Sequence, residues 1–88
     1  QRDGGNVGIG TTSSQHKLHI NGTGTILNLT STSSYVDMIM QVTGNTGYLN
    51  LDSTKMNFYV GGGSTANNKM SILTTGKVGI GTQSPNAN

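Results

Sequence analysis

Apolar residues spaced two positions apart recur along almost the whole chain. A period of two places such residues on one face of a β-strand, because successive side chains of a strand point to opposite faces. No window shows the spacing of three and four that marks an amphipathic helix. The pattern therefore predicts seven or eight short strands and no helix. The sets are Val7 and Ile9; Leu18 and Ile20; Leu27 and Leu29; Val36, Met38, Met40 and Val42; Leu49 and Leu51; Met56, Phe58 and Val60; Met70 and Ile72; and Val78 and Ile80.

Turn-forming sequences separate these sets. They are Asn21-Gly22, Gly44-Asn45-Thr46-Gly47, Gly61-Gly62-Gly63 and Thr75-Gly76. More than half of the 88 residues are Gly, Thr, Asn or Ser, whereas only 9% are charged and the net charge is +2. Intrinsic disorder is favoured by high net charge as well as by low apolar content, so this composition does not predict it. We expect an ordered all-β module with short strands that are rich in Gly, Thr, Ser and Asn.

The supply of large apolar side chains is small for a domain of this size. Only 18 of the 88 residues are Leu, Ile, Val or Phe. A single copy of the chain has little apolar surface to bury against the entropy of ordering its backbone. We therefore expect that much of the stabilising burial comes from other copies of the chain or from neighbouring repeats.

One sequence element occurs twice. Residues 5–14 align without gaps with residues 76–85, with seven of ten positions identical and an offset of 71, so that Val-Gly-Ile-Gly-Thr stands at 7–11 and again at 78–82. One face of such a strand carries the β-branched side chains of Val and Ile, and the other face is bare because it carries only glycine hydrogens. A bare face predicts either close packing of another backbone or a tight bend. We expect a single module over 1–88, part of a longer chain, with trimer packing through Val7, Gly8, Ile9, Gly10, Val78, Gly79, Ile80 and Gly81.

The repeated element carries a resemblance to a known family. Residues 6–14 read Asn-Val-Gly-Ile-Gly-Thr-Thr-Ser-Ser and residues 17–22 read Lys-Leu-His-Ile-Asn-Gly. Together they resemble the "NVGIGTTSP..KLHVNG" signature of phage tail fibres and related surface fibres, often found upstream of an endosialidase-type intramolecular chaperone. Residues 70–85 resemble another form of the same signature. Ser14 replaces the Pro of the signature, and the 88 residues contain no chaperone domain, so the resemblance transfers architecture and role but no catalytic residue.

The resemblance implies a homotrimer whose chains are intertwined or lie side by side, as in a trimeric β-helix or β-prism. Its implied role is that of a structural and host-adhesion segment of a viral tail fibre, placed in the virion or outside the cell, with exposed loops that bind a host cell-surface glycan. Two alternatives remain open. One is a bacterial or environmental extracellular fibre or adhesin, and the other is a fragment of a polysaccharide depolymerase carried on a fibre.

Several other functions find no support in the sequence. Cysteine is absent, no apolar run is long enough to cross a membrane, and the five Lys and Arg residues form no basic patch, so we predict no disulfide, no membrane insertion and no nucleic-acid partner. Glycoside hydrolysis requires two paired carboxylates, and the only candidates are Asp3, Asp37 and Asp52. His16 and His19 are three apart and would lie on opposite faces of a strand. We predict no catalytic site, no metal site and no cofactor.

Sugar contact is the function for which the chain offers candidate side chains. An exposed aromatic ring can stack on a pyranose while amide and hydroxyl groups bind its polar edge. Tyr59 is the best candidate, because it alternates with Phe58 and Val60 and precedes the triple glycine of 61–63. Loops on a rigid scaffold are common recognition sites. We therefore predict glycan contact by Tyr59 with Asn67 and Asn68, and Tyr35 and Tyr48 are further tyrosines of interest.

Overall fold

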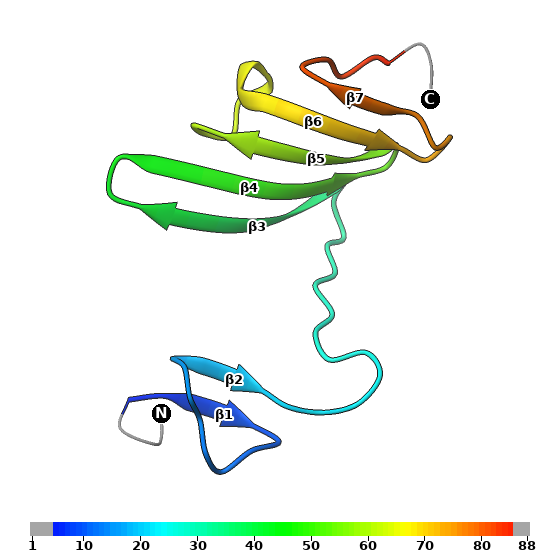
Figure 1. Ribbon diagram of the computed structural model, residues 1–88. Helices are drawn as coiled ribbons and strands as arrows, with labels where there is room; N and C mark the ends of the chain where they lie inside the picture. Colours follow the sequence, from blue (N-terminus) through cyan, green and yellow to red (C-terminus); the bar gives the residue numbers. More distant parts are fainter. Residues whose placement is uncertain (1–4, 86–88) are drawn as a thin grey trace.

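The computed structural model describes residues 5–85 and contains two separate sheets joined by an irregular segment (Figure 1). A two-stranded parallel sheet comes first, and a five-stranded antiparallel sheet in the order β3-β4-β5-β6-β7 follows. The elements are β1 (Val7–Ile9), β2 (Leu18–Ile20), β3 (Tyr35–Val42), β4 (Asn45–Asp52), β5 (Lys55–Val60), the 3-10 turn η1 (Thr65–Asn67), β6 (Asn68–Leu73) and β7 (Val78–Ile80). The prediction of an all-β chain is confirmed for the described residues.

The connection between the two sheets differs from the prediction. Leu27 and Leu29 have the spacing of a strand, but residues 21–34 contain no strand and are exposed throughout. Both leucines instead line an apolar pocket of about 240 Å³ beside Val36, Leu49 and other residues of the large sheet. A strand requires a hydrogen-bonded neighbour, and two alternating leucines do not specify one.

The large sheet is a meander whose turns fall close to the predicted ones. Gly44, with φ of 89°, lies in the turn between β3 and β4, and Gly76, with φ of 94°, lies in the turn between β6 and β7. Left-handed backbone of this kind favours glycine. The sequence predicts Asn45 and Gly47 in the first turn, but both belong to β4. The register shifts between Phe58 and Tyr59, where β5 and β6 pair with a bulge.

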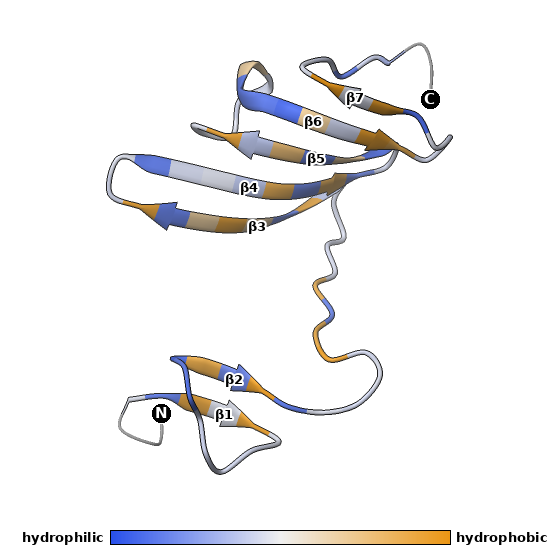
Figure 2. Ribbon diagram, viewed as in Figure 1, coloured by the Kyte–Doolittle hydropathy of each residue, from blue (hydrophilic) through white to orange (hydrophobic). Residues whose placement is uncertain are grey.

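One face of the large sheet is apolar and open. Three cross-strand rows of paired positions contain no charged residue: Val36, Leu51, Met56, Ile72 and Val78; Met38, Leu49, Phe58, Met70 and Ile80; and Met40, Gly47 and Val60. Figure 2 shows the alternation of hydrophobic and hydrophilic residues along these strands. No hydrophobic residue among the described ones is fully buried, and Ile80 is 79% exposed. Residues 5–85 of a single chain therefore form no closed apolar core.

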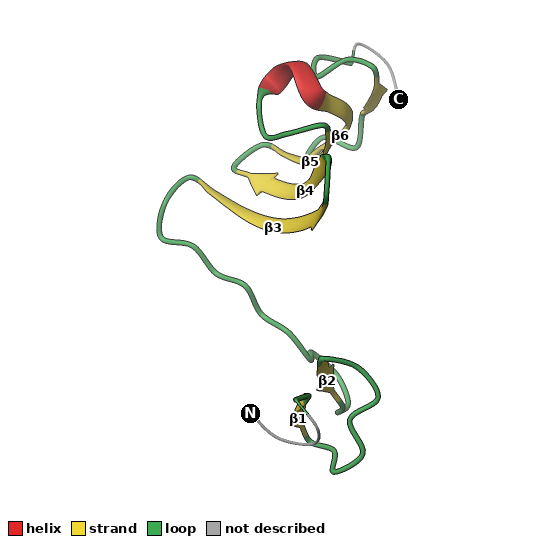
Figure 3. Ribbon diagram, turned by 90° about the vertical axis from the view of Figure 1, so that its left-hand side faces the viewer, coloured by secondary structure: helices red, strands yellow, loops and turns green. Residues whose placement is uncertain are grey.

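The opposite face is polar and partly covered by the chain itself. Its central row runs from Asp37 through Asn50, Asn57 and Ser71 to Gly79. In the view of Figure 3 the η1 turn lies beside β6. The Gln83 amide donates to the Thr65 carbonyl oxygen at 3.1 Å and so joins the segment after β7 to this turn. The buried residues of the sheet are consequently polar.

The bare face of each Val-Gly-Ile-Gly strand is occupied by the chain's own following loop. A Cβ placed on Gly79 would lie 2.4 Å from the Thr82 carbonyl oxygen, and one on Gly8 would lie 2.9 Å from the Thr11 carbonyl oxygen. Such distances are too short for real side chains, so both positions require glycine. The predicted close approach of a backbone is therefore present within one chain, combined with a tight bend, and a second copy is not needed to explain these two glycines.

Candidate functional site

A groove on the polar face gathers three tyrosines with a carboxylate and an amide. It is lined by Tyr35, Asp37, Tyr48, Asn50, Tyr59 and Gly63, and its volume is about 290 Å³. The lining residues come from β3, β4, β5 and the loop after β5. Tyr35 is exposed, whereas Tyr48 and Tyr59 are half-buried. Aromatic rings next to a few polar groups are features that suit the binding of a sugar.

Strand register brings the tyrosines together. Tyr48 and Tyr59 are directly paired on β4 and β5, and their rings meet edge to face with centroids 6.0 Å apart at 61°. Tyr35 begins β3 and is 54% exposed, so its ring is available to a ligand. Gly63 passes so close to Tyr48 that a Cβ there would lie 2.9 Å from the Tyr48 Cζ atom. The glycine-rich loop therefore forms the wall beside this ring.

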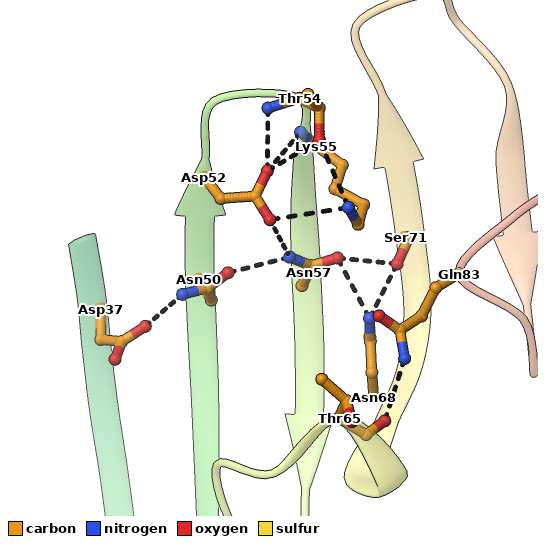
Figure 4. Close-up of polar contacts among 10 residues, drawn as sticks. All are labelled: Asp37, Asn50, Asp52, Thr54, Lys55, Asn57, Thr65, Asn68, Ser71 and Gln83. Carbon is orange, nitrogen blue, oxygen red and sulfur yellow. Dashed lines mark hydrogen bonds and ion pairs between the residues drawn. The ribbon is translucent and has the colours of Figure 1, made fainter. Parts of the chain in front are cut away.

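Hydrogen bonds within the sheet fix the polar groups of the groove (Figure 4). Asn50 Nδ2 donates to Asp37 Oδ1 at 2.5 Å, and Asn50 Oδ1 accepts from Asn57 Nδ2 at 2.8 Å. The amide of Asn50 is thus oriented from both sides. Asp37 Oδ2 has no hydrogen-bond partner within residues 5–85. A carboxylate oxygen of this kind can accept a hydrogen bond from a ligand hydroxyl.

The predicted glycan residues do not all lie at this groove. Tyr59 lines it, as do Tyr35 and Tyr48. Asn67 lies outside it, where its Nδ2 donates to Ser64 Oγ at 3.2 Å. Asn68 is only 8% exposed and its Nδ2 donates to Asn57 Oδ1 and Ser71 Oγ, so this amide is an interior group rather than a surface contact.

Sequence reasoning did not select Asp37 and Asn50 as binding residues. The alternation of apolar residues predicts Asp37 on the face opposite Met38, which the register confirms, and Asn50 is paired with Asp37 on that face. What the alternation cannot give is the pairing of Asp37 with Asn50 across two strands. The sequence signal that could have identified them is that each is a polar residue between two apolar ones, Asp37 in β3 and Asn50 in β4.

Asp52 has a structural role at the end of β4. Its Oδ1 accepts from the backbone N–H of Thr54 at 2.8 Å and of Lys55 at 2.9 Å, and its Oδ2 lies 3.7 Å from Lys55 Nζ. Burial acts to raise the pKa of Asp52, but these bonds, with those from the Thr54 hydroxyl and the Asn57 amide, hold the pKa below its ordinary value. The charged carboxylate thus stabilises the turn into β5.

The two histidines lie closer together than strand geometry predicts. His16 precedes β2, so the rule for opposite faces does not apply to it, and its ring meets that of His19 with centroids 6.5 Å apart. The Gln15 backbone N–H donates to His19 Nδ1 at 3.3 Å, which gives this imidazole a role in the returning loop. Within residues 5–85, no group of three or more potential ligands from His, Cys, Asp and Glu could hold a metal ion.

Comparison with known proteins gives no assignment for the chain. No model of a protein family matches the sequence. No curated protein matches it either. In the described part of the chain, no helix has the length and apolar character needed to cross a membrane.

Proposed function

We propose that the chain is a non-enzymatic structural and adhesive segment of a trimeric fibre, of the kind found in phage tails. The observation that carries the proposal is that the large sheet buries residues of its polar face and leaves its apolar face open. Its polar face holds the buried residues Asn57, Asn68 and Ser71, whereas its apolar face is open. The resemblance of residues 6–22 to fibre sequences supports the same role.

The apolar face is the surface at which copies of the chain associate. Its three paired rows are uncharged and two of them span all five strands, so two such faces can meet without burying an unpaired charge. Large exposed apolar patches mark interaction sites. Three copies placed side by side, each with this face toward a common axis, form a triangular β-prism in which Val78 and Ile80 are buried. This arrangement supplies the apolar core that one copy lacks.

The same arrangement directs the tyrosine groove outward. The groove and the apolar face lie on opposite sides of one sheet, because the side chains of Tyr48 and Leu49 alternate along β4. A trimer then presents three grooves, and weak binding of a glycan at each becomes useful through avidity. We propose that the adhesive contact is made by Tyr35, Tyr48, Tyr59 and Asp37.

The oligomeric state is the first test. Light scattering and sedimentation at micromolar concentration should give the mass of a trimer that resists dilution. A folded monomer, with the strand content of the wild type, would contradict the proposal. Because the test does not depend on sugar binding, it separates assembly from adhesion.

Adhesion is tested on a glycan array and by adsorption to host cells. The variant is Tyr59→Ala, and the control is Gln41→Ala, which changes an exposed residue of the polar face outside the groove. We expect binding to fall at least tenfold for Tyr59→Ala and to remain unchanged for the control, with equal trimer content. Equal binding by all three proteins, or binding by none, would reduce the proposal to a purely structural shaft.

Two further measurements distinguish the alternatives, a depolymerase fragment and a cellular adhesin, from a phage fibre. Release of reducing ends from a host polysaccharide would favour a depolymerase fragment. Binding to surface glycans by a chain encoded outside any viral gene cluster would favour a cellular adhesin that uses the same repeat.

A further inference from the structure

The two copies of the Val-Gly-Ile-Gly sequence form strands with complementary hydrogen-bonding edges. The first copy, β1, pairs in parallel with β2, which follows it in the chain. The second copy, β7, pairs antiparallel with β6, which precedes it. Among the described strands, β7 is the last of its sheet, so its outer edge has no neighbour. The first copy therefore shows the motif paired with the strand that follows it, and the second copy shows it paired with the strand that precedes it.

The local structures of the two copies match in detail. Gly10 and Gly81, which are equivalent under the 71-residue offset, have φ of 76° and 79°. Thr11 Oγ1 accepts from the Ser13 N–H at 3.1 Å, and Thr82 Oγ1 accepts from the Ser84 N–H at 3.1 Å. In both copies the loop folds back over the central glycine of the strand. The loop that follows β7 therefore begins with the same local geometry as the loop that connects β1 to β2.

The hydrogen bonds show that the two pairings use opposite edges of the strand. In β1 the Val7 N–H donates to the Lys17 carbonyl at 2.8 Å, and the Ile9 carbonyl accepts from the Asn21 N–H at 2.9 Å. These are the first and third residues of the motif. Because backbone groups of successive strand residues point to alternate edges, the central glycine and the flanking residues face the other side.

β7 pairs with β6 through the opposite edge, the one that β1 does not use for β2. The Lys77 carbonyl accepts from the Leu73 N–H at 2.9 Å, and the Gly81 N–H donates to the Lys69 carbonyl at 2.9 Å. The backbone groups of Val78 and Ile80 consequently face outward, as the equivalents of the Val7 and Ile9 groups that bind β2. An unpaired edge of this kind is a template for a further strand.

We propose that the outer edge of β7 is a docking site for a parallel strand of the Lys-Leu-His-Ile type found at 17–20. The register is that of β1 with β2, so Val78, Gly79 and Ile80 pair with the Leu, His and Ile of the incoming strand. The Val-Gly-Ile-Gly strand then pairs on both edges, with β6 of its own hairpin on one side and with the incoming parallel strand on the other. Successive modules of a fibre are linked through one continuous sheet.

The test adds such a strand after the 88 residues of the chain. Position 88 is equivalent to position 17, so the sequence of residues 18–22, Leu-His-Ile-Asn-Gly, is fused after Asn88. The control is a Gly-Ser extension of the same length. We expect the Val78 amide to exchange with solvent at least tenfold more slowly with the Leu-His-Ile extension than with the control. Contacts between Val78 or Ile80 and the added Leu and Ile should appear in nuclear Overhauser spectra.

A proline variant tests which edge is used. Val78→Pro removes the outward N–H, whose equivalent in Val7 binds Lys17, and leaves the bonds between β6 and β7 unaltered. In this variant the contacts to the extension should disappear while the Leu73 amide, which reports on the hairpin, stays protected. Equal exchange of Val78 with both extensions, or contacts that survive Val78→Pro, would overturn the proposal. Both outcomes are independent of whether the chain forms a trimer.

Discussion

The Ser71 hydroxyl donates a 2.7 Å hydrogen bond to Asn57 Oδ1, and both side chains are almost inaccessible to solvent, at 0% and 1% exposure. Asn57 Nδ2 donates in turn to Asn50 Oδ1 and to Asp52 Oδ2, while Asn68 Nδ2 also donates to Asn57 Oδ1 (Figure 4). Asn57 therefore connects β4, β5 and β6 at the centre of the polar face. A buried network of this kind is stabilising only when its members remain paired.

Asn57→Ala should destabilise the folded chain by about 2 kcal/mol, because it leaves buried donors and acceptors without partners. Urea unfolding followed by circular dichroism measures the loss. Gln41→Ala is the matched control, since within residues 5–85 this exposed side chain makes a single hydrogen bond, to Thr46. Its effect on the free energy of unfolding should stay within about 0.5 kcal/mol. Equal effects of the two substitutions would show that the network contributes little.

Gly79→Val should destabilise the chain by about 1–3 kcal/mol, because the added Cβ overlaps the Thr82 carbonyl oxygen. Gly8→Val should act in the same direction through the Thr11 carbonyl oxygen and the Ser14 hydroxyl. Thermal unfolding measures both. Gly47→Val is the control, since a Cβ there lies 3.5 Å from its nearest neighbour, an ordinary contact. A Gly79→Val chain that melts like the control would refute the requirement for a bare strand face.

Acid should weaken the chain through Asp52. Burial alone raises the pKa of this group, but its hydrogen bonds from Thr54, Lys55 and Asn57 outweigh burial, so the pKa lies below its ordinary value of 3.8. A group with a lowered folded-state pKa contributes stability that is complete above its unfolded pKa and is lost as the pH falls through the folded one. Unfolding measured between pH 6 and 2 should show this loss, and the loss should be smaller in Asp52→Asn.

Met40→Asp should dissociate the trimer, whereas Ile39→Asp should not. The two residues are neighbours on β3 and are similarly exposed, at 58% and 56%, but only Met40 lies on the apolar face. A charge buried at the interface without a partner is costly. Sedimentation at micromolar concentration measures the mass of both variants, and circular dichroism confirms that they retain the strand content of the wild type. Equal masses for the two would place the interface elsewhere.

The period-two alternation determined most of the large sheet. It placed Asp37 opposite Met38 and Tyr59 opposite Phe58, because the direction of a strand side chain depends only on its position in the local sequence. The same reasoning predicted a strand at Leu27 and Leu29 that does not form, since a strand also needs a partner whose position is not encoded locally. The repeat at offset 71 was likewise visible in the sequence, and its two copies have the same turn geometry.

Only the tertiary structure decided which face is covered. The alternation identifies an apolar face and a polar face, and it predicts that the apolar one is buried. Within residues 5–85, the fully buried side chains lie on the polar face instead, where the segment after β7 folds over Gly79 and binds the η1 turn through Gln83. Asn57, Asn68 and Ser71 are interior residues of this face, whereas Tyr48 and Tyr59 line a groove on it. Burial and the grouping of side chains depend on contacts between distant segments, which residue order alone does not specify.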